Sequence, residues 1–142
     1  WEGRMEEIAP HIYVDGAHNV EAINAYIDTM KALHGDDHRI LVFAAVKDKE
    51  YDSMIRLLAE NIEYEHIIVT SVDSSRRADS ARLAEIFSEV AAAPVTVCDV
   101  IGDAMDMAVK LRADRADVNI YCVGSLYLVG GVKRWRKDHD QL

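Results

Sequence analysis

Ile12-Tyr13-Val14-Asp15-Gly16-Ala17-His18-Asn19 joins a short apolar run to a long segment with helical spacing. The stretch places an acid, a glycine, a histidine and an amide where a predicted strand ends and a predicted helix begins. Open α/β sheets bind their ligands at such junctions, outside the carboxyl ends of the strands. This stretch therefore indicates both the fold class and the place of a candidate site.

The rest of the chain repeats the strand-to-helix pattern. The predicted strands are nearly continuous apolar runs, as in sheets buried on both faces, and apolar residues recur at helical spacing between them. We expect strands at residues 12–15, 39–45, 66–70, 94–98 and 119–123, and helices at 19–34, 54–61, 81–90, 102–112 and from 126 onward. Right-handed crossovers then produce a three-layer, Rossmann-like α/β domain with a mainly parallel sheet of five or six strands and helices on both faces.

Composition limits the class of protein. The 142 residues are 50% hydrophobic and 29% charged, which is typical of one globular domain with a substantial core. The net charge of −9 argues against a nucleic-acid partner, because phosphate binding needs an excess of Lys and Arg. No apolar run approaches the roughly 18 residues of a membrane span. Cys98 and Cys122 lie in apolar runs without metal-ligand spacing, so we expect buried free thiols and a cytoplasmic protein.

Polar residues follow several of the predicted strands, at residues 15–19, 47–49, 71–77 and 124–125. The carboxyl ends of parallel strands meet at one edge of a sheet, so charged groups of both signs converge there. Such an edge suits an anionic ligand with a hydrophilic partner, for example a nucleotide together with an amino acid.

Each of these groups also has a purely structural interpretation. Gly16 allows the backbone to approach a ligand closely, and His18 and Asn19 begin a helix, whose free N–H groups favour an anion. Asp15 and Asn19 are equally consistent with a turn and a helix N-cap, and His18 alone with a surface histidine.

The basic residues and the glycine-serine pair leave the same choice open. Lys47, Lys49 and the pair Arg76-Arg77 can bind phosphate or carboxylate, or form a solvated surface. Gly124-Ser125 suits an anion-binding nest or a simple helix cap. The sequence contains neither a P-loop motif nor a dinucleotide-binding glycine fingerprint. The chain is therefore a binding domain or one half of a larger site.

Three segments carry a resemblance to a known family: Trp1-Glu2-Gly3-Arg4-Met5-Glu6, Asp15-Gly16-Ala17-His18-Asn19 and Gly124-Ser125-Leu126-Tyr127-Leu128-Val129-Gly130. In order and separation they resemble the C-terminal domain of folylpolyglutamate synthases. That family includes bifunctional dihydrofolate synthases and belongs to the Mur ligase superfamily. Asp48-Lys49 and Arg77-Ala78 fit the same pattern.

The resemblance implies an ATP-dependent ligase. A P-loop domain would bind ATP and Mg²⁺ and phosphorylate a folate or dihydropteroate carboxylate, and L-glutamate would then attack the acyl phosphate. The C-terminal domain would close over the nucleotide, with Arg4 and Asp15 binding nucleotide and His18 and Ser125 binding glutamate. The supporting residues would be Asn19, Lys49, Arg77 and Gly124.

The resemblance implies no catalytic residue and no metal ligand in this chain. Because the sequence begins at Trp1 rather than a methionine, we expect residues 1–142 to be a single domain of a longer ligase. Its own P-loop domain would be a partner, and the isolated domain would be inactive.

Three residues depart from the family pattern, namely Glu2, Val20 and Gly131. Two alternatives remain open. The chain is either the C-terminal domain of another Mur-type amino-acid ligase, or a stand-alone α/β binding or signalling module. A receiver-like module would have paired acids after its first strand, whereas only Asp15 follows the first strand here.

Overall fold

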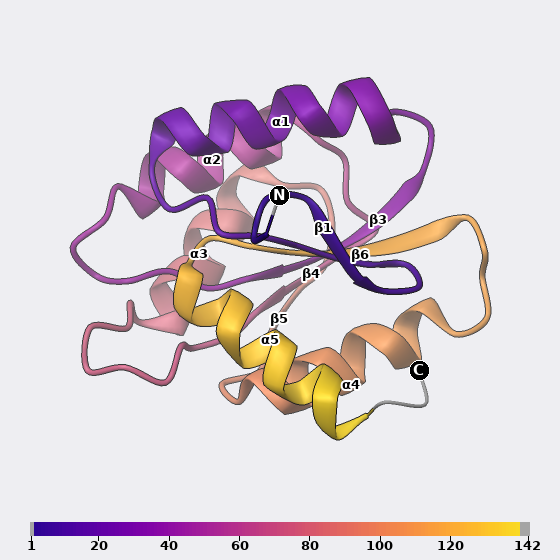
Figure 1. Cartoon of the computed structure of the whole chain (residues 1–142). Helices are drawn as coiled ribbons and strands as arrows, with labels where there is room; N and C mark the ends of the chain where they lie inside the picture. Colours follow the sequence, from indigo (N-terminus) through magenta and orange to yellow (C-terminus); the bar gives the residue numbers. More distant parts are fainter. Residues whose placement is uncertain (1, 140–142) are drawn as a thin grey trace.

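The computed structural model describes residues 2–139, so Trp1 of the N-terminal segment lies outside the described part (Figure 1). The described chain forms a six-stranded sheet in the order β1-β2-β6-β3-β4-β5. All neighbouring strands are parallel except β1, which pairs antiparallel with β2. The strands are β1 (Glu6–Ala9), β2 (Ile12–Asp15), β3 (His38–Phe43), β4 (His66–Val69), β5 (Val95–Val97) and β6 (Val118–Val123).

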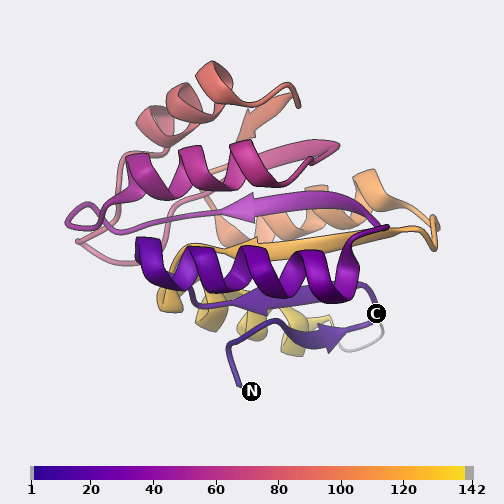
Figure 2. The same cartoon turned by 90° about the horizontal axis from the view of Figure 1, so that it is seen from above.

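Five helices cover the two faces of this sheet. Figure 2 shows α1, α2 and α3 in a row on one side of the sheet, and Figure 1 shows α4 and α5 on the other side. The helices are α1 (Val20–His34), α2 (Tyr51–Asn61), α3 (Ser80–Val90), α4 (Ile101–Arg112) and α5 (Leu126–Asp138). The expected three-layer architecture is confirmed.

Strand alternation divides the core between the two faces. On β3, Leu41 and Phe43 pack with α1, α2 and α3, whereas Ile40 and Val42 pack with α4 and α5. All four side chains are at most 2% exposed. Burial of both faces explains why β3 reads as an uninterrupted apolar run rather than as an alternating pattern.

Strand β1 was not predicted from the sequence, which indicated only an N-terminal segment closed by Pro10. Its register pairs Glu6 with Val14, and the connection to β2 passes through His11 at φ 67°. The strand has four residues and a mixed burial pattern, so it carries little period-2 signal.

Side-chain caps begin three of the five helices in the described part of the chain. The side chains of Asn19, Asp79 and Ser125 accept hydrogen bonds from the first turns of α1, α3 and α5. The apolar segment that begins at Leu126 extends as helix to Asp138. Within the described residues, no helix is long and apolar enough to cross a membrane.

The two cysteines differ in burial. Cys122 is fully buried on β6, as expected, whereas Cys98 is only partly buried because β5 is an edge strand. Both are free thiols.

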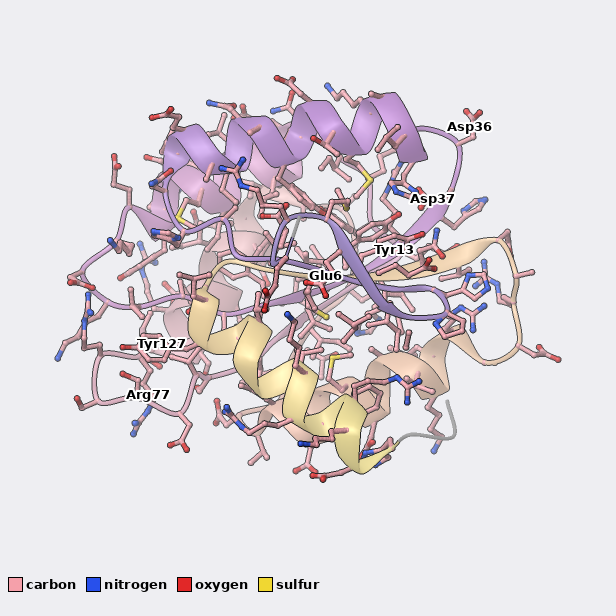
Figure 3. The ribbon with its side chains drawn as sticks, in the orientation of Figure 1. Glu6, Tyr13, Asp36, Asp37, Arg77 and Tyr127 are labelled. Carbon is pink, nitrogen blue, oxygen red and sulfur yellow. The ribbon has the colours of Figure 1, made fainter. Side chains whose placement is uncertain are left out.

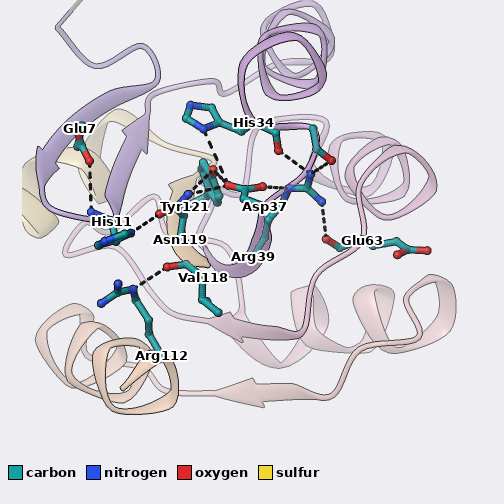
Figure 4. A network of polar contacts seen from close by, with 11 residues as sticks. Glu7, His11, His34, Asp37, Arg39, Glu63, Arg112, Val118, Asn119 and Tyr121 are labelled. Carbon is teal, nitrogen blue, oxygen red and sulfur yellow. Dashed lines mark hydrogen bonds and ion pairs between the residues drawn. The ribbon is translucent and has the colours of Figure 1, made fainter. Parts of the chain in front are cut away.

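A polar network closes the amino end of the sheet, opposite the candidate site (Figure 4). The Asp37 carboxylate pairs with Arg39 Nε at 2.9 Å and accepts hydrogen bonds from Asn119 Nδ2, at 2.8 Å, and from the Tyr121 hydroxyl. The network ties the α1–β3 connection to β6 and thereby fixes the register at the centre of the sheet.

Candidate functional site

Two adjoining pockets lie at the carboxyl edge of the sheet, where the sequence predicted a site. The Arg4 pocket, of about 660 Å³, is lined by Arg4, Asp15 and His18 among others. The Ser125 pocket, of about 370 Å³, is lined by His18, Val46, Lys49, Arg76, Ser125, Leu126 and Tyr127. His18 and Leu126 line both pockets, so the two pockets adjoin.

Asp15 is 8% exposed and uses both carboxylate oxygens on the backbone. One oxygen accepts the Ala17 N–H at 2.9 Å and the other accepts the Met5 N–H at 3.1 Å. Burial raises the pKa of this carboxyl, although these two hydrogen bonds and the nearby Arg4 oppose the rise. Asp15 therefore fastens the N-terminal segment to the end of β2.

The N-terminal segment is held at two further points, which fix the exposed Arg4 beside the pocket. Gly16 N–H donates to Gly3 O at 2.7 Å, and Gly3 N–H donates to Glu6 Oε1 at 2.7 Å. Glu6, labelled in Figure 3, also pairs with Lys133 of α5 at 3.1 Å. The Gly3 hydrogen bond is the main cause that lowers the pKa of Glu6, with Lys133 contributing less.

His18 has a defined orientation at the start of α1. Its Nδ1 lies 2.9 Å from Gly16 O. A carbonyl oxygen only accepts hydrogen bonds, so Nδ1 carries the proton and donates it. In the neutral ring, Nε2 is then an acceptor for a ligand N–H or O–H group.

Gly124 and Ser125 form the turn between β6 and α5. Gly124 has φ +124°, and a Cβ at this position would lie 2.2 Å from Ala44 O. Only glycine fits this close approach of two strand ends. Ser125, which is 2% exposed, then caps α5 by accepting the Tyr127 N–H at 3.0 Å.

The two adjacent arginines lie on opposite sides of one loop. Arg76 lines the Ser125 pocket and pairs with Asp48 at 2.5 Å. Arg77 instead lines a separate cleft of about 1120 Å³ between the α3 and α4 starts, and donates to Ser74 O at 3.1 Å. Figure 3 shows Arg77 in this loop, at the same end of the molecule as Tyr127.

The structure thus brings most of the predicted site residues together. Lys49 joins His18 and Ser125 in one pocket, and Arg4 and Asp15 join His18 in the other. Asn19 acts as the N-cap of α1 and accepts the Ala22 N–H at 2.8 Å. Arg77, which the resemblance indicates as a supporting residue, lines a different cleft, whereas its neighbour Arg76 lines the pocket of His18.

No group of three or more His, Cys, Asp or Glu side chains among residues 2–139 is arranged to hold a metal ion. The polar lining at this edge consists of cations, hydroxyls, an imidazole, backbone groups and the carboxylates of Glu2 and Asp15, and Asp15 is already bonded to backbone N–H groups. The two pockets are suited to bind anionic and N–H-bearing ligands.

A mainly parallel sheet covered by helices on both faces, with two adjoining pockets at its carboxyl edge, defines a Rossmann-like α/β domain. The chain belongs to the Mur ligase, glutamate ligase domain family, which it matches over residues 3–126.

Similar proteins support the same family. Dihydrofolate synthase/folylpolyglutamate synthase of Bacillus subtilis is 42% identical over 60 residues, which cover 41% of this chain and 14% of that protein. Folylpolyglutamate synthase of Mycobacterium tuberculosis, complexed with ADP and AMPPCP, is 25% identical with a TM-score of 0.78 and covers 93% of this chain. The fold also matches E. coli FolC in complex with DHPP and ADP, at 20% identity and a TM-score of 0.83 over 97% of this chain. The chain spans about a third of those two solved structures, 31% and 32% respectively.

Proposed function

We propose that this chain is the domain that contacts glutamate and nucleotide in an ATP-dependent ligase. The ligase would add L-glutamate to a folate, to dihydropteroate, or to both. The observation that supports this function best is the pair of adjoining pockets that share His18. A reaction between an activated carboxylate and an amine needs two ligands side by side, and these pockets have a place for each.

In the proposed reaction, the γ-phosphoryl group of ATP passes to the folate carboxylate and ADP is formed. The neutral glutamate amine then attacks the acyl carbon, the C–N bond forms, and the bond from that carbon to the phosphate-bearing oxygen breaks. Inorganic phosphate thereby leaves, and the nitrogen gives up one proton to phosphate or solvent. The Arg4 pocket would face the nucleotide, with Asp15 holding the segment that presents Arg4. The Ser125 pocket would hold glutamate. One of the solved relatives was obtained with Mn, AMPPNP and L-glutamate bound.

A separate P-loop domain of the same longer protein would bind the phosphates of ATP and Mg²⁺. The absence of a P-loop motif from the sequence is compatible with this division of roles. The two free cysteines suit a reducing cytoplasm as the place of the ligase.

Phosphate release tests the proposal. We expect the longer protein to release phosphate from ATP only when both L-glutamate and a folate acceptor are present. We expect the 142-residue chain alone to release none, since half of the site is missing. Turnover by the isolated chain, or phosphate release by the longer protein that is independent of glutamate, would contradict the assignment.

A further inference from the structure

The Ser125 pocket has more cationic side chains than are needed to bind the single α-carboxylate of an amino acid. Lys49 and Arg76 both line it, and Asp48, the acid that pairs with Arg76, is not among the lining residues. A zwitterionic α-amino acid carries one carboxylate and one ammonium. His18 lines the pocket and its Nε2 is left as an acceptor for the ammonium, and the first turn of α5 borders the pocket, where the helix dipole favours the α-carboxylate. Two further cations indicate a second carboxylate on the ligand.

The backbone decides which of the two adjacent arginines can serve this pocket. Lys47 N–H donates to Arg76 O at 2.7 Å, Ala78 N–H donates to Ala45 O at 2.9 Å, and Val46 forms an antiparallel bridge with Arg77. Successive side chains of an extended segment point to opposite sides. Arg76 therefore faces the Ser125 pocket and Arg77 faces the other cleft, and a change of roles would require these hydrogen bonds to break.

The ion pair of Arg76 leaves its guanidinium available to a ligand. Arg76 and Asp48 pair at 2.5 Å, with side chains 47% and 55% exposed. Exposed pairs of this kind contribute little to stability, so a ligand carboxylate can replace or share the Asp48 contact at low cost. A guanidinium binds a carboxylate through two parallel N–H groups, which adds geometric selectivity to the charge.

We infer that Arg76, assisted by Lys49, binds the side-chain carboxylate of the incoming amino acid and makes the site selective for an acidic one. This inference rests on the proposed function and assigns a residue within it. Arg77, which the resemblance indicates as a supporting residue, has no part in this contact.

Steady-state kinetics of the longer ligase test the assignment, with Arg76→Gln as the variant and Arg77→Gln as the matched control. We expect Arg76→Gln to raise the KM for L-glutamate about tenfold or more, as expected for a lost charge-assisted hydrogen bond. The KM for ATP should stay within about twofold. The ratio of kcat/KM for L-glutamate to that for L-glutamine should fall by a similar factor, because glutamine lacks the second carboxylate. Arg76→Lys should restore part of the selectivity.

The outcomes separate this inference from the function on which it rests. If the wild-type ligase shows no glutamate-dependent phosphate release, both are overturned. If the wild type is active but Arg77→Gln, and not Arg76→Gln, raises the KM for glutamate, the proposed function stands and the assignment of Arg76 is wrong. Equal changes in the KM for L-glutamate and the KM for ATP would also overturn it. The melting temperature of each variant, compared with that of the wild type, tests whether these exposed substitutions leave the fold intact.

Discussion

Replacement of Gly124 by alanine tests how the turn between β6 and α5 is built. Gly124 combines φ +124° with a close approach to the neighbouring strand, where a Cβ would lie 2.2 Å from Ala44 O and 2.9 Å from a Phe43 ring carbon. The obstructing oxygen belongs to the backbone, so it cannot move aside as a flexible side chain would.

The expected loss of stability has two contributions. Holding alanine at this φ costs about 1–3 kcal/mol. Displacing the Ala44 peptide to relieve the overlap costs about 1–3 kcal/mol more, as other overpacked sites do. Alanine restricts the unfolded chain and thereby returns about 0.4–1 kcal/mol. Together these contributions predict that Gly124→Ala lowers the free energy of unfolding by about 1–5 kcal/mol, with about 3 kcal/mol at the centre of the range.

Urea denaturation of the 142-residue chain, followed by circular dichroism, measures this change. The matched control is Gly130→Ala, which lies within α5 and whose Cβ would meet nothing nearer than an Arg134 nitrogen at 3.5 Å. Alanine is the better helix former, so this control should be neutral or up to about 1 kcal/mol more stable. A Gly124→Ala variant within about 1 kcal/mol of wild type would refute the reasoning.

Three further predictions concern single side chains. In the longer ligase, His18→Ala should raise the KM for glutamate more than the KM for ATP, and equal effects in steady-state kinetics would count against the role of His18. Asp37→Ala should cost about 2–4 kcal/mol in urea denaturation, because Arg39 and Tyr121 lose their partner, and should leave the KM for glutamate unchanged. The pKa of Asp15, followed by carboxyl ¹³C NMR, should lie above 3.8, because the side chain is buried. The contribution of Asp15 to the free energy of unfolding should therefore fall as the pH rises from 3.8 to this raised pKa. A titration midpoint at or below 3.8 would show that the two N–H donors outweigh burial.

The parallel part of the sheet was predictable because each strand is buried on both faces and reads as an apolar run. The run around Leu41 and Phe43 has no other simple interpretation in a chain of this composition. Strand β1 was not predictable, because its four residues show no apolar alternation and its pairing depends on a turn with His11 at positive φ. Left-handed backbone at a non-glycine residue leaves no signal in a single sequence.

The candidate site was predictable at the level of the sheet edge. Asp15, His18 and Ser125 follow strands, and the topology alone brings them to adjoining pockets. The choice between Arg76 and Arg77 was not predictable. It depends on how the loop after β4 pairs with residues 45–47, and this pairing is a tertiary contact that local sequence does not encode.

The central claim is that residues 1–142 form the glutamate-binding wall of a folate ligase. Mass spectrometry of the products formed by the longer protein from ATP, L-glutamate and a folate or dihydropteroate acceptor tests it most directly. The account predicts an acceptor heavier by one glutamyl residue, formed in equal amount with ADP and phosphate, and lost when the domain is deleted. An unmodified acceptor, or a glutamyl product that persists without the domain, would contradict it.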